Sequence, residues 1–211
     1  MTANVVTFSN PMGSGGTTIA RTVATKLRYR YYDWEVISQA AEEAGMQPED
    51  FALAAAERAP GFIERIVELL GNMSAGDEPP PGTGPSSLFT SSDDYRRFLE
   101  HVVRSLGSQG EAVIVNHSGQ AVLRDMPSVL KVLTYGSEDR RAARLAELQG
   151  SDPAAVRKMI VEADRQRSDY FRRVYHVDWL SSLNYDIVIN TDRVAGDLAA
   201  DIVGAAAKEL P

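Results

Sequence analysis

The sequence contains no cysteine among its 211 residues. This absence excludes disulfides, thiolate catalysis and cysteine-ligated zinc sites. No apolar run approaches the length that a membrane span requires, and the first residues do not combine a charged leader with a long apolar stretch. We therefore expect a cytoplasmic protein that has no membrane partner.

An excess of positive charge is also lacking. The net charge of −7 argues against a general nucleic-acid-binding protein, because such a protein presents a basic surface to phosphates. Hydrophobic residues make up 44% of the chain and charged residues 24%, which is ordinary for a globular protein. The length suits one well-buried domain, so we expect a single domain over residues 1–211.

Short apolar runs alternate with helical patterns along the chain. Runs at residues 4–9, 29–37, 111–116, 130–136 and 185–191 predict strands, and the second of these is a short strand that breaks at Asp33. Apolar spacing predicts helices at about 17–27, 35–45, 49–58, 60–72, 91–107, 138–149, 152–174 and 196–209. This alternation predicts an α/β fold with a largely parallel sheet, in which ligands bind beyond the carboxyl ends of the strands.

One stretch has too many prolines and glycines for regular structure. It reads "GDEPPPGTGPSS" at residues 76–87, and few apolar side chains could anchor it. A mobile loop and a solvent-exposed linker are equally consistent with this composition. A protein-interaction segment is a further alternative, and only this interpretation requires the stretch for partner binding.

The stretch "SNPMGSGGTTIA" at residues 9–20 lies between the first expected strand and the first expected helix. Its glycines let backbone N–H groups converge on an anion at the N-terminus of the helix, and two hydroxyls follow where a phosphate or Mg²⁺ would lie. These residues are Gly13, Gly15, Gly16, Thr17 and Thr18. In the pattern G-x-x-x-x-G-K-[ST], Gly16 takes the place of the lysine. A glycine-rich turn without any ligand is the alternative.

Without that lysine, compensating cations must come from elsewhere in the chain. Residues 140–173 carry nine basic and five acidic side chains, a local charge of +4 in a protein of net charge −7. Arginine suits phosphate oxygens because its donors are planar and bidentate. A solvated helix with ion pairs along its surface is the alternative for this segment. Asp33 and Asn116–Ser118 end two further strands at the same expected edge, where a ligand contact and a cap or turn are both open.

Six blocks carry a family resemblance: "GSGGTTIA", "YYDWEVISQAAEEAG", "EAVIVNHSG", "VLKVLTYGSEDRRAARL", "ADRQRSDYFRRVYHVDW" and "NYDIVINT". In this order, and over nearly the whole chain, they resemble the cytidylate kinase-like family of P-loop nucleoside monophosphate kinases. The resemblance implies a P-loop kinase-like three-layer α/β/α fold with a five-stranded, mainly parallel sheet and a helical lid. It also implies an acceptor-side helical insert at about 35–105 and an arginine-rich lid at about 150–175.

The same resemblance implies ATP and Mg²⁺ as cofactors and transfer of the γ-phosphoryl group to a nucleoside monophosphate or a similar small acceptor. Proteins of this branch often carry "GSGG" without the lysine. The expected nucleotide-binding residues are Gly13, Ser14, Gly15, Gly16, Thr17, Thr18, Arg140 and Arg144. The expected catalytic residues are Asp33, Arg165, Arg167 and Arg172, and Thr17 is expected to hold the metal.

A second function stays open at this point. A nucleotide-binding or regulatory protein would keep the fold but not the turnover. Gly16 favours it because it replaces the lysine of the usual phosphate loop, and Asn10 and His117 favour it because the family commonly has arginines there. The oligomeric state is also open, with a homodimer as one alternative.

Overall fold

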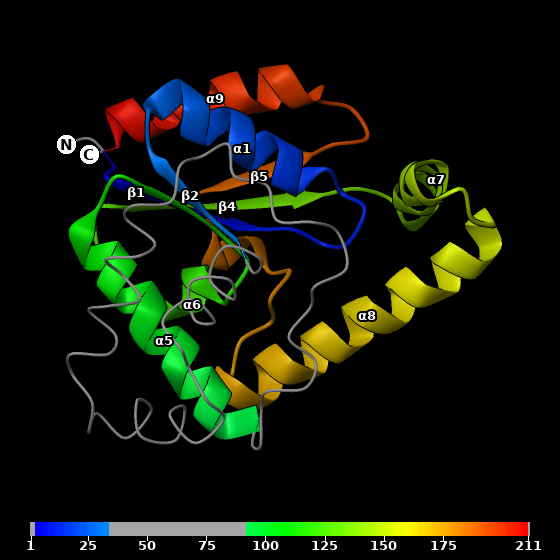
Figure 1. Cartoon of the computed structure of the whole chain (residues 1–211), viewed down its shortest axis with the longest axis horizontal. Helices are drawn as coiled ribbons and strands as arrows, with labels where there is room; N and C mark the ends of the chain where they lie inside the picture. The colour runs from blue at the N-terminus through cyan, green and yellow to red at the C-terminus, as the bar shows by residue number, and fades with distance from the viewer. Residues whose placement is uncertain (1–2, 34–91, 211) are drawn as a thin grey trace, which may run out of the picture.

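A five-stranded parallel sheet forms the centre of the molecule (Figure 1). The strands are β1 (Val5–Ser9), β2 (Arg30–Tyr32), β3 (Ala112–Val115), β4 (Val129–Tyr135) and β5 (Ile187–Asn190), in the order β2-β3-β1-β4-β5. All four pairings are parallel, and β1 lies between β3 and β4. β1 and β3 are buried throughout, as strands covered on both faces require; β3 is wholly apolar, and β1 also carries the buried polar residues Thr7 and Ser9.

The computed structural model describes residues 3–33 and 92–210. The predicted helices at 35–45, 49–58 and 60–72, the stretch at 76–87 and most of the predicted insert at about 35–105 lie outside these residues. Within the described ranges, no helix is both long enough and apolar enough to cross a membrane.

Helices cover both faces of the sheet (Figure 1). On one face lie α1 (Gly16–Leu27) and α9 (Gly196–Glu209), whose buried residues join the main core. On the other lie α5 (Ser92–Gln109) and the single turn α6 (Gly119–Val122). The predicted three-layer α/β/α architecture is therefore confirmed.

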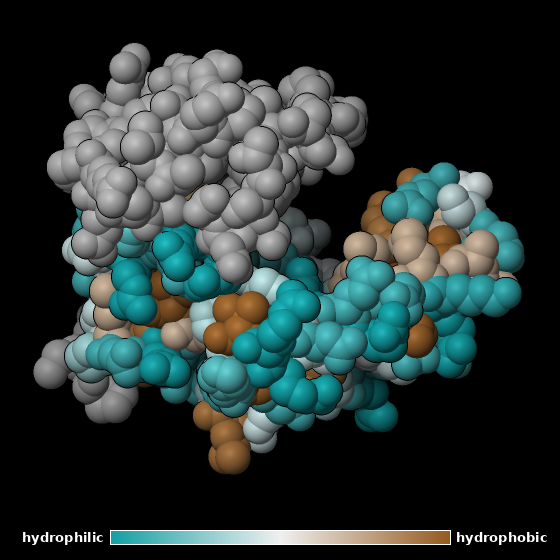
Figure 2. Space-filling view, turned by 90° about the horizontal axis from the view of Figure 1, so that it is seen from below, coloured by the Kyte–Doolittle hydropathy of each residue, from teal (hydrophilic) through white to brown (hydrophobic). Residues whose placement is uncertain are grey.

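Two helices extend the molecule beyond the carboxyl ends of the strands (Figure 1). They are α7 (Glu138–Gln149), which follows β4, and α8 (Pro153–Val174). The Asp152 carboxylate caps α8 by accepting hydrogen bonds from the backbone N–H groups of Ala154 and Ala155. We call α7 and α8 together the arm. In Figure 2 it stands out at the right, with hydrophilic residues along its lower side and apolar residues grouped above them. That α8 acts as a lid stays a prediction.

The remaining chain closes the fold beside β5. A 3₁₀ turn, η1 (Ser182–Asn184), precedes β5, and α9 then returns along α1. The backbone N–H of Ala3 donates to the carbonyl of Ala207, 2.7 Å away, so the two ends of the described chain lie side by side (Figure 1).

Candidate functional site

The glycine loop (residues 10–15) joins β1 to α1 at the carboxyl edge of the sheet. Gly13 and Gly15 both have φ of +78°, a left-handed conformation that glycine adopts without strain. A Cβ on Gly13 would lie 2.6 Å from the carbonyl oxygen of Arg141. Gly15 has no side chain to cap the first amides of α1, which leaves them for an anion or water. The loop therefore combines left-handed glycines with uncapped amides at a helix N-terminus, and phosphate binding by it stays a prediction.

A cavity of about 290 Å³ opens over this loop, and we call it the loop cavity. It is lined by Asn10, Met12, Gly13, Thr17, Asn116, Ala163, Asp164 and Arg167. The amide of Asn10 lies 3.5 Å from the hydroxyl of Thr17, which faces the cavity from the first turn of α1. Nowhere in residues 3–33 and 92–210 do three or more His, Asp or Glu side chains gather as metal ligands.

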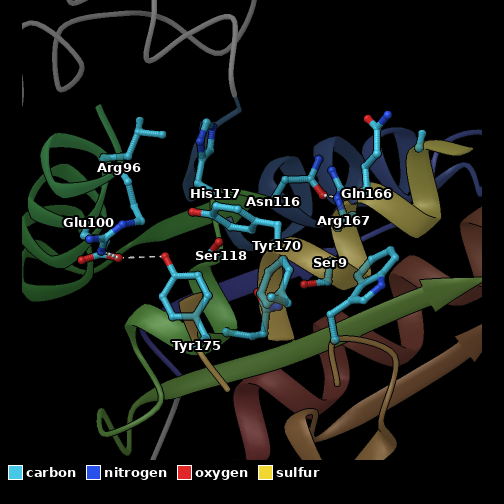
Figure 3. A pocket seen from close by; sticks show the side chains of 15 residues that line it. Ser9, Arg96, Glu100, Asn116, His117, Ser118, Gln166, Arg167, Tyr170 and Tyr175 are labelled. Atoms are coloured by element: carbon cyan, nitrogen blue, oxygen red, sulfur yellow. Dashed lines mark hydrogen bonds and ion pairs between the residues drawn. The ribbon is translucent and has the colours of Figure 1, made fainter. Parts of the chain in front are cut away.

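A second cavity of about 530 Å³ adjoins the first, and we call it the aromatic cavity (Figure 3). Its aromatic lining residues are Tyr170, Phe171, Tyr175 and Trp179. The Tyr175 hydroxyl donates to Glu100, 2.9 Å away, and Glu100 also accepts a hydrogen bond from Arg96 at 2.8 Å. Burial raises the pKa of Tyr175, so its hydroxyl stays protonated. The wall thus offers aromatic surface together with a paired carboxylate and guanidinium.

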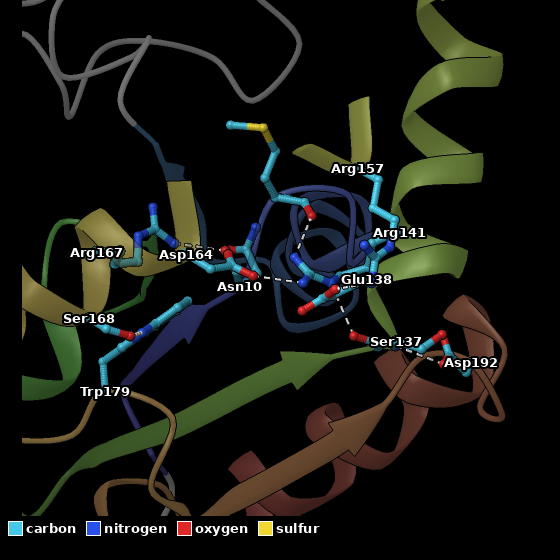
Figure 4. Close-up of polar contacts among 12 residues, drawn as sticks. Asn10, Ser137, Glu138, Arg141, Arg157, Asp164, Arg167, Ser168, Trp179 and Asp192 are labelled. Atoms are coloured by element: carbon cyan, nitrogen blue, oxygen red, sulfur yellow. Dashed lines mark hydrogen bonds and ion pairs between the residues drawn. The ribbon is translucent and has the colours of Figure 1, made fainter. Parts of the chain in front are cut away.

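Arg167 lies at the boundary, since it lines both cavities together with Asn116 and Ala163. Its guanidinium donates to the Asn10 carbonyl at 2.9 Å and lies 5.1 Å from the ring centre of Trp179 (Figure 4). The Trp179 indole N–H in turn donates to Ser168 at 2.7 Å, which fixes the ring. Burial lowers the pKa of Arg167, but a guanidinium remains a cation at neutral pH. A held positive charge therefore lies between the two cavities.

A strained turn follows β3 in the walls of both cavities. Asn116, His117 and Ser118 have φ values of +65°, +46° and +56°, three successive non-glycine residues in the left-handed region. Such a conformation costs about 1–2 kcal/mol per residue, and strain of this kind gathers at functional sites. Although His117 as a residue is only half-buried, its Nε2 is fully enclosed, and burial lowers the pKa of its ring to about 4. The imidazole is therefore neutral near pH 7.

The profile of the Cytidylate kinase-like family matches residues 5–193, most of the chain. The chain belongs to the cytidylate kinase-like family. The resemblance inferred from the six sequence blocks is thereby confirmed.

Individual relatives in this family are distant. A cytidylate kinase from Methanopyrus kandleri is 25% identical over 207 residues, which cover 98% of this chain and 94% of the relative. A cytidylate kinase from Streptomyces griseus is 26% identical over 180 residues, covering 76% and 75% of the two chains. The crystal structure of an uncharacterized protein from Eubacterium ventriosum has a TM-score of 0.61 at 18% identity and covers 94% of both chains. This last likeness shows a shared fold.

Several residues predicted for a cytidylate kinase-like site come together at the glycine loop. Gly13, Thr17 and Arg167 line the loop cavity. Arg144 donates to the Gly13 carbonyl at 2.6 Å, so its charge lies beside the loop. Gly15 and Gly16 form the turn into α1, and a Cβ on Gly16 would overlap the Thr134 hydroxyl and the Asn10 side chain.

Other predicted residues lie apart from the loop cavity in this structure. Arg165 and Arg172 are exposed and both contact Asp169 on their own helix; Arg165 also binds Glu162 at 2.7 Å. Arg140 and Thr18 are exposed, whereas the Ser14 hydroxyl is buried, 3.3 Å from that of Thr134. The nucleotide and catalytic roles of these five residues stay predictions.

Asp33 is nearly buried at the end of β2, 8% exposed. Its carboxylate pairs with Arg21 at 3.2 Å, and the Arg21 guanidinium also lies 4.7 Å from the ring centre of Tyr31. The backbone of Asp33 hydrogen-bonds the ring of His117, which places Asp33 behind the wall of the aromatic cavity. Its role toward an acceptor stays a prediction.

Sequence reasoning missed Arg141 as a site residue and the Glu100–Tyr175 pair altogether. Arg141 is 4% exposed and donates to the Met12 carbonyl at 3.0 Å and to Asp164 at 2.6 Å (Figure 4). The sequence does carry a signal that Arg141 faces inward. Arg141 lies four residues before Leu145 and so on the same face of α7, and Leu145 packs on the small core between α7 and α8. The Glu100–Tyr175 contact joins residues 75 apart, and nothing in the local sequence marks it.

Proposed function

We propose that this chain is an ATP-dependent phosphotransferase that passes the γ-phosphoryl group to a nucleoside monophosphate or a similar small acceptor. Family membership and the names of the relatives from Methanopyrus kandleri and Streptomyces griseus support a nucleotide kinase. The observation that carries the proposal is the position of Arg167 at the boundary of two adjoining cavities. A phosphoryl group passing from one cavity to the other would meet this cation.

In this proposal the loop cavity takes the ATP phosphates. Amides at the start of α1 and the positive end of its dipole would bind the β-phosphate. Mg²⁺, which usually binds to phosphates, waters and one or two protein oxygens, fits the Thr17 hydroxyl as a ligand. When bound, it would neutralise charge on the phosphates.

The acceptor occupies the aromatic cavity. Its oxygen attacks the γ-phosphorus, the bond from that phosphorus to the bridging β-phosphate oxygen breaks, and ADP leaves with the electron pair. If that oxygen is a hydroxyl, its proton passes to the transferred phosphoryl group or to solvent. Asp33, which lies behind the cavity wall and pairs with Arg21, is the proposed residue that orients the acceptor. Little covalent chemistry falls to the protein, so positioning and charge stabilisation supply the catalysis.

Arg167 takes over the charge that the missing lysine would supply. It is held by Asn10, Asn116 and Trp179, so its position does not depend on the ligand. Arg165 and Arg172 remain part of the proposal. For each of them, closing over the phosphoryl group would exchange a surface ion pair for a phosphate contact.

The first experiment is a calorimetric titration of Mg-ATP into the protein, alone and with each nucleoside monophosphate. A monophosphate that strengthens ATP binding identifies the acceptor, and ADP release is then followed in its presence. Saturable ATP binding without ADP release under any condition would favour the binding or regulatory alternative. No ATP binding at all would overturn the proposal.

Arg167→Met tests the central residue, and Arg173→Met is the matched control. Arg173 is an exposed arginine on the last turn of the same helix, away from both cavities. We expect Arg167→Met to lower kcat by about 100-fold or more, by analogy with arginines that stabilise a transferring phosphoryl group. Arg173→Met should keep the wild-type rate. Equal kcat values in the two variants would contradict the role of Arg167.

A further inference from the structure

Four backbone carbonyls of the glycine loop, those of residues 10–13, have hydrogen-bond partners in the structure. The Asn10 carbonyl accepts from Arg167, the Met12 carbonyl from Arg141 and the Gly13 carbonyl from Arg144. The Pro11 carbonyl accepts from the backbone N–H of Ser14 at 3.1 Å. A loop keeps its amides available to an anion more readily when its carbonyls are already hydrogen-bonded to other groups. Arginines from α7 and α8 satisfy three of these four carbonyls.

Arg141 is the most constrained of the three arginines. Its side chain is 4% exposed and donates to three separate segments: the Met12 carbonyl, the Gly136 carbonyl at the end of β4, and the Asp164 carboxylate on α8. Removing a guanidinium from water is unfavourable unless its donors are paired, and here donors on all three nitrogens are. The Arg141 carbonyl also lies against Gly13, so its backbone packs on the loop as well.

Asp164 links this arrangement to the arginine between the cavities. Asp164 and Arg167 are three residues apart on α8 and both line the loop cavity. The chain of contacts thus runs from the Met12 carbonyl through Arg141 and Asp164 to the helix that carries Arg167. All of these contacts are made within the protein, without a bound ligand.

We propose that Arg141 is a positioning residue, which holds the glycine loop in its anion-binding shape from behind and, through Asp164, fixes α8 relative to it. Arg141 thus acts on the shape of the loop, whereas Arg167 supplies charge at the reaction centre. The role of Arg141 in the shape of the loop stands by itself. Its effect on nucleotide binding rests on the proposed phosphotransferase function.

The test compares Arg141→Met with Arg157→Met. Arg157 also joins α7 and α8, through Glu138 and Asp139, but on the exposed side and without touching the loop. Hydrogen exchange of the ligand-free protein is measured in peptides that cover residues 10–16 and, for comparison, α9. Arg141→Met should speed exchange in the loop and leave α9 unchanged, and Arg157→Met should change neither. Loop exchange at the wild-type rate in Arg141→Met would overturn the inference.

Binding of Mg-ATP and of inorganic tripolyphosphate gives the functional readout. We expect Arg141→Met to weaken both by about tenfold or more, and Arg141→Lys to recover only part of the loss, since one ammonium cannot reach all three acceptors. If Arg141→Met binds Mg-ATP and tripolyphosphate with wild-type affinity, Arg141 does not contribute to nucleotide binding.

If the wild-type protein binds neither compound, the proposed function fails and the exchange result still decides the role of Arg141. If Arg141→Met does not fold, Arg141→Lys and Asp164→Asn take its place, with faster loop exchange again expected.

Discussion

At the scale of single residues, the candidate site contains backbone and side-chain groups in states that would be unfavourable without their neighbours. The left-handed turn at Asn116–Ser118 is strained, and the His117 ring is kept neutral by burial. The Arg167 guanidinium is partly desolvated against Trp179. Each state persists because neighbouring groups fix it, which is how a site becomes organised before its ligand arrives.

His117 gives a pH dependence of stability. Its folded pKa of about 4 lies below the ordinary value of 6.5, so between these two pH values the unfolded chain binds a proton that the folded protein excludes. The stability that the protein has with a neutral His117 ring is therefore fully present above about pH 6.5 and is lost as the pH falls toward 4. We expect the free energy of unfolding to fall by up to about 1.4 kcal/mol per pH unit in this window.

His117→Asn isolates this contribution, because asparagine tolerates a positive φ and does not titrate. Urea unfolding of the two proteins at a series of pH values measures the difference in their free energies of unfolding. That difference should change steadily between about pH 6.5 and 4, in the direction of relative loss for the wild-type protein. A constant difference would mean that the ring is not held neutral.

At the scale of elements, the order and type of the described strands and of the longer helices could be predicted from the sequence, whereas the short turns α6 and η1 were not predicted. The helices expected at 138–149 and 196–209 match α7 and α9 residue for residue, because their apolar spacing and flanking residues are regular. The five strands were also predicted, since a parallel sheet covered on both faces needs apolar runs.

Which face of α8 turns inward was harder to predict. Arg165 and Arg172 share one face, and charge alone did not distinguish them from Arg167. The structure buries Val156, Ile160 and Phe171, and Arg167 lies seven residues after Ile160 and four before Phe171. The apolar stripe therefore marks Arg167 as the inward arginine, a signal that counting charges overlooked. The partner of Arg141 could not be predicted, because Asp164 reaches it only through the packing of α7 on α8.

The start of α8 depends on its cap. We expect Asp152→Ala to destabilise the first turn by about 1 kcal/mol, because the N–H groups of Ala154 and Ala155 lose their acceptor. Asp152→Asn should lose much less, since its side-chain oxygen still accepts. Hydrogen exchange at the beginning of α8 measures both variants. Equal loss in the alanine and asparagine variants would show that charge at the helix dipole, rather than the cap, is responsible.

At the scale of the whole molecule, nucleotide binding should be linked to stability. Any ligand that binds only the folded state stabilises it, by about 2.7 kcal/mol at a concentration of 100 times its Kd. We expect Mg-ATP to raise the free energy of urea unfolding by this amount. Adenosine at the same concentration should have little effect, because the proposed contacts are made by the phosphates. An equal increase with adenosine would place the binding energy in the base.

The adjacent ends of the described chain have a consequence for engineering. The Ala3–Ala207 hydrogen bond shows that a short linker could join the two ends without disturbing the order of the sheet. New ends could then be opened at Gly150–Ser151, where the exposed connection between α7 and α8 carries no strand pairing. In such a circular permutant, α7 with Arg141 and α8 with Asp164 and Arg167 would no longer be joined directly by the backbone, so only their contacts would hold them together. Its activity would report whether the arm needs a continuous backbone or only its contacts.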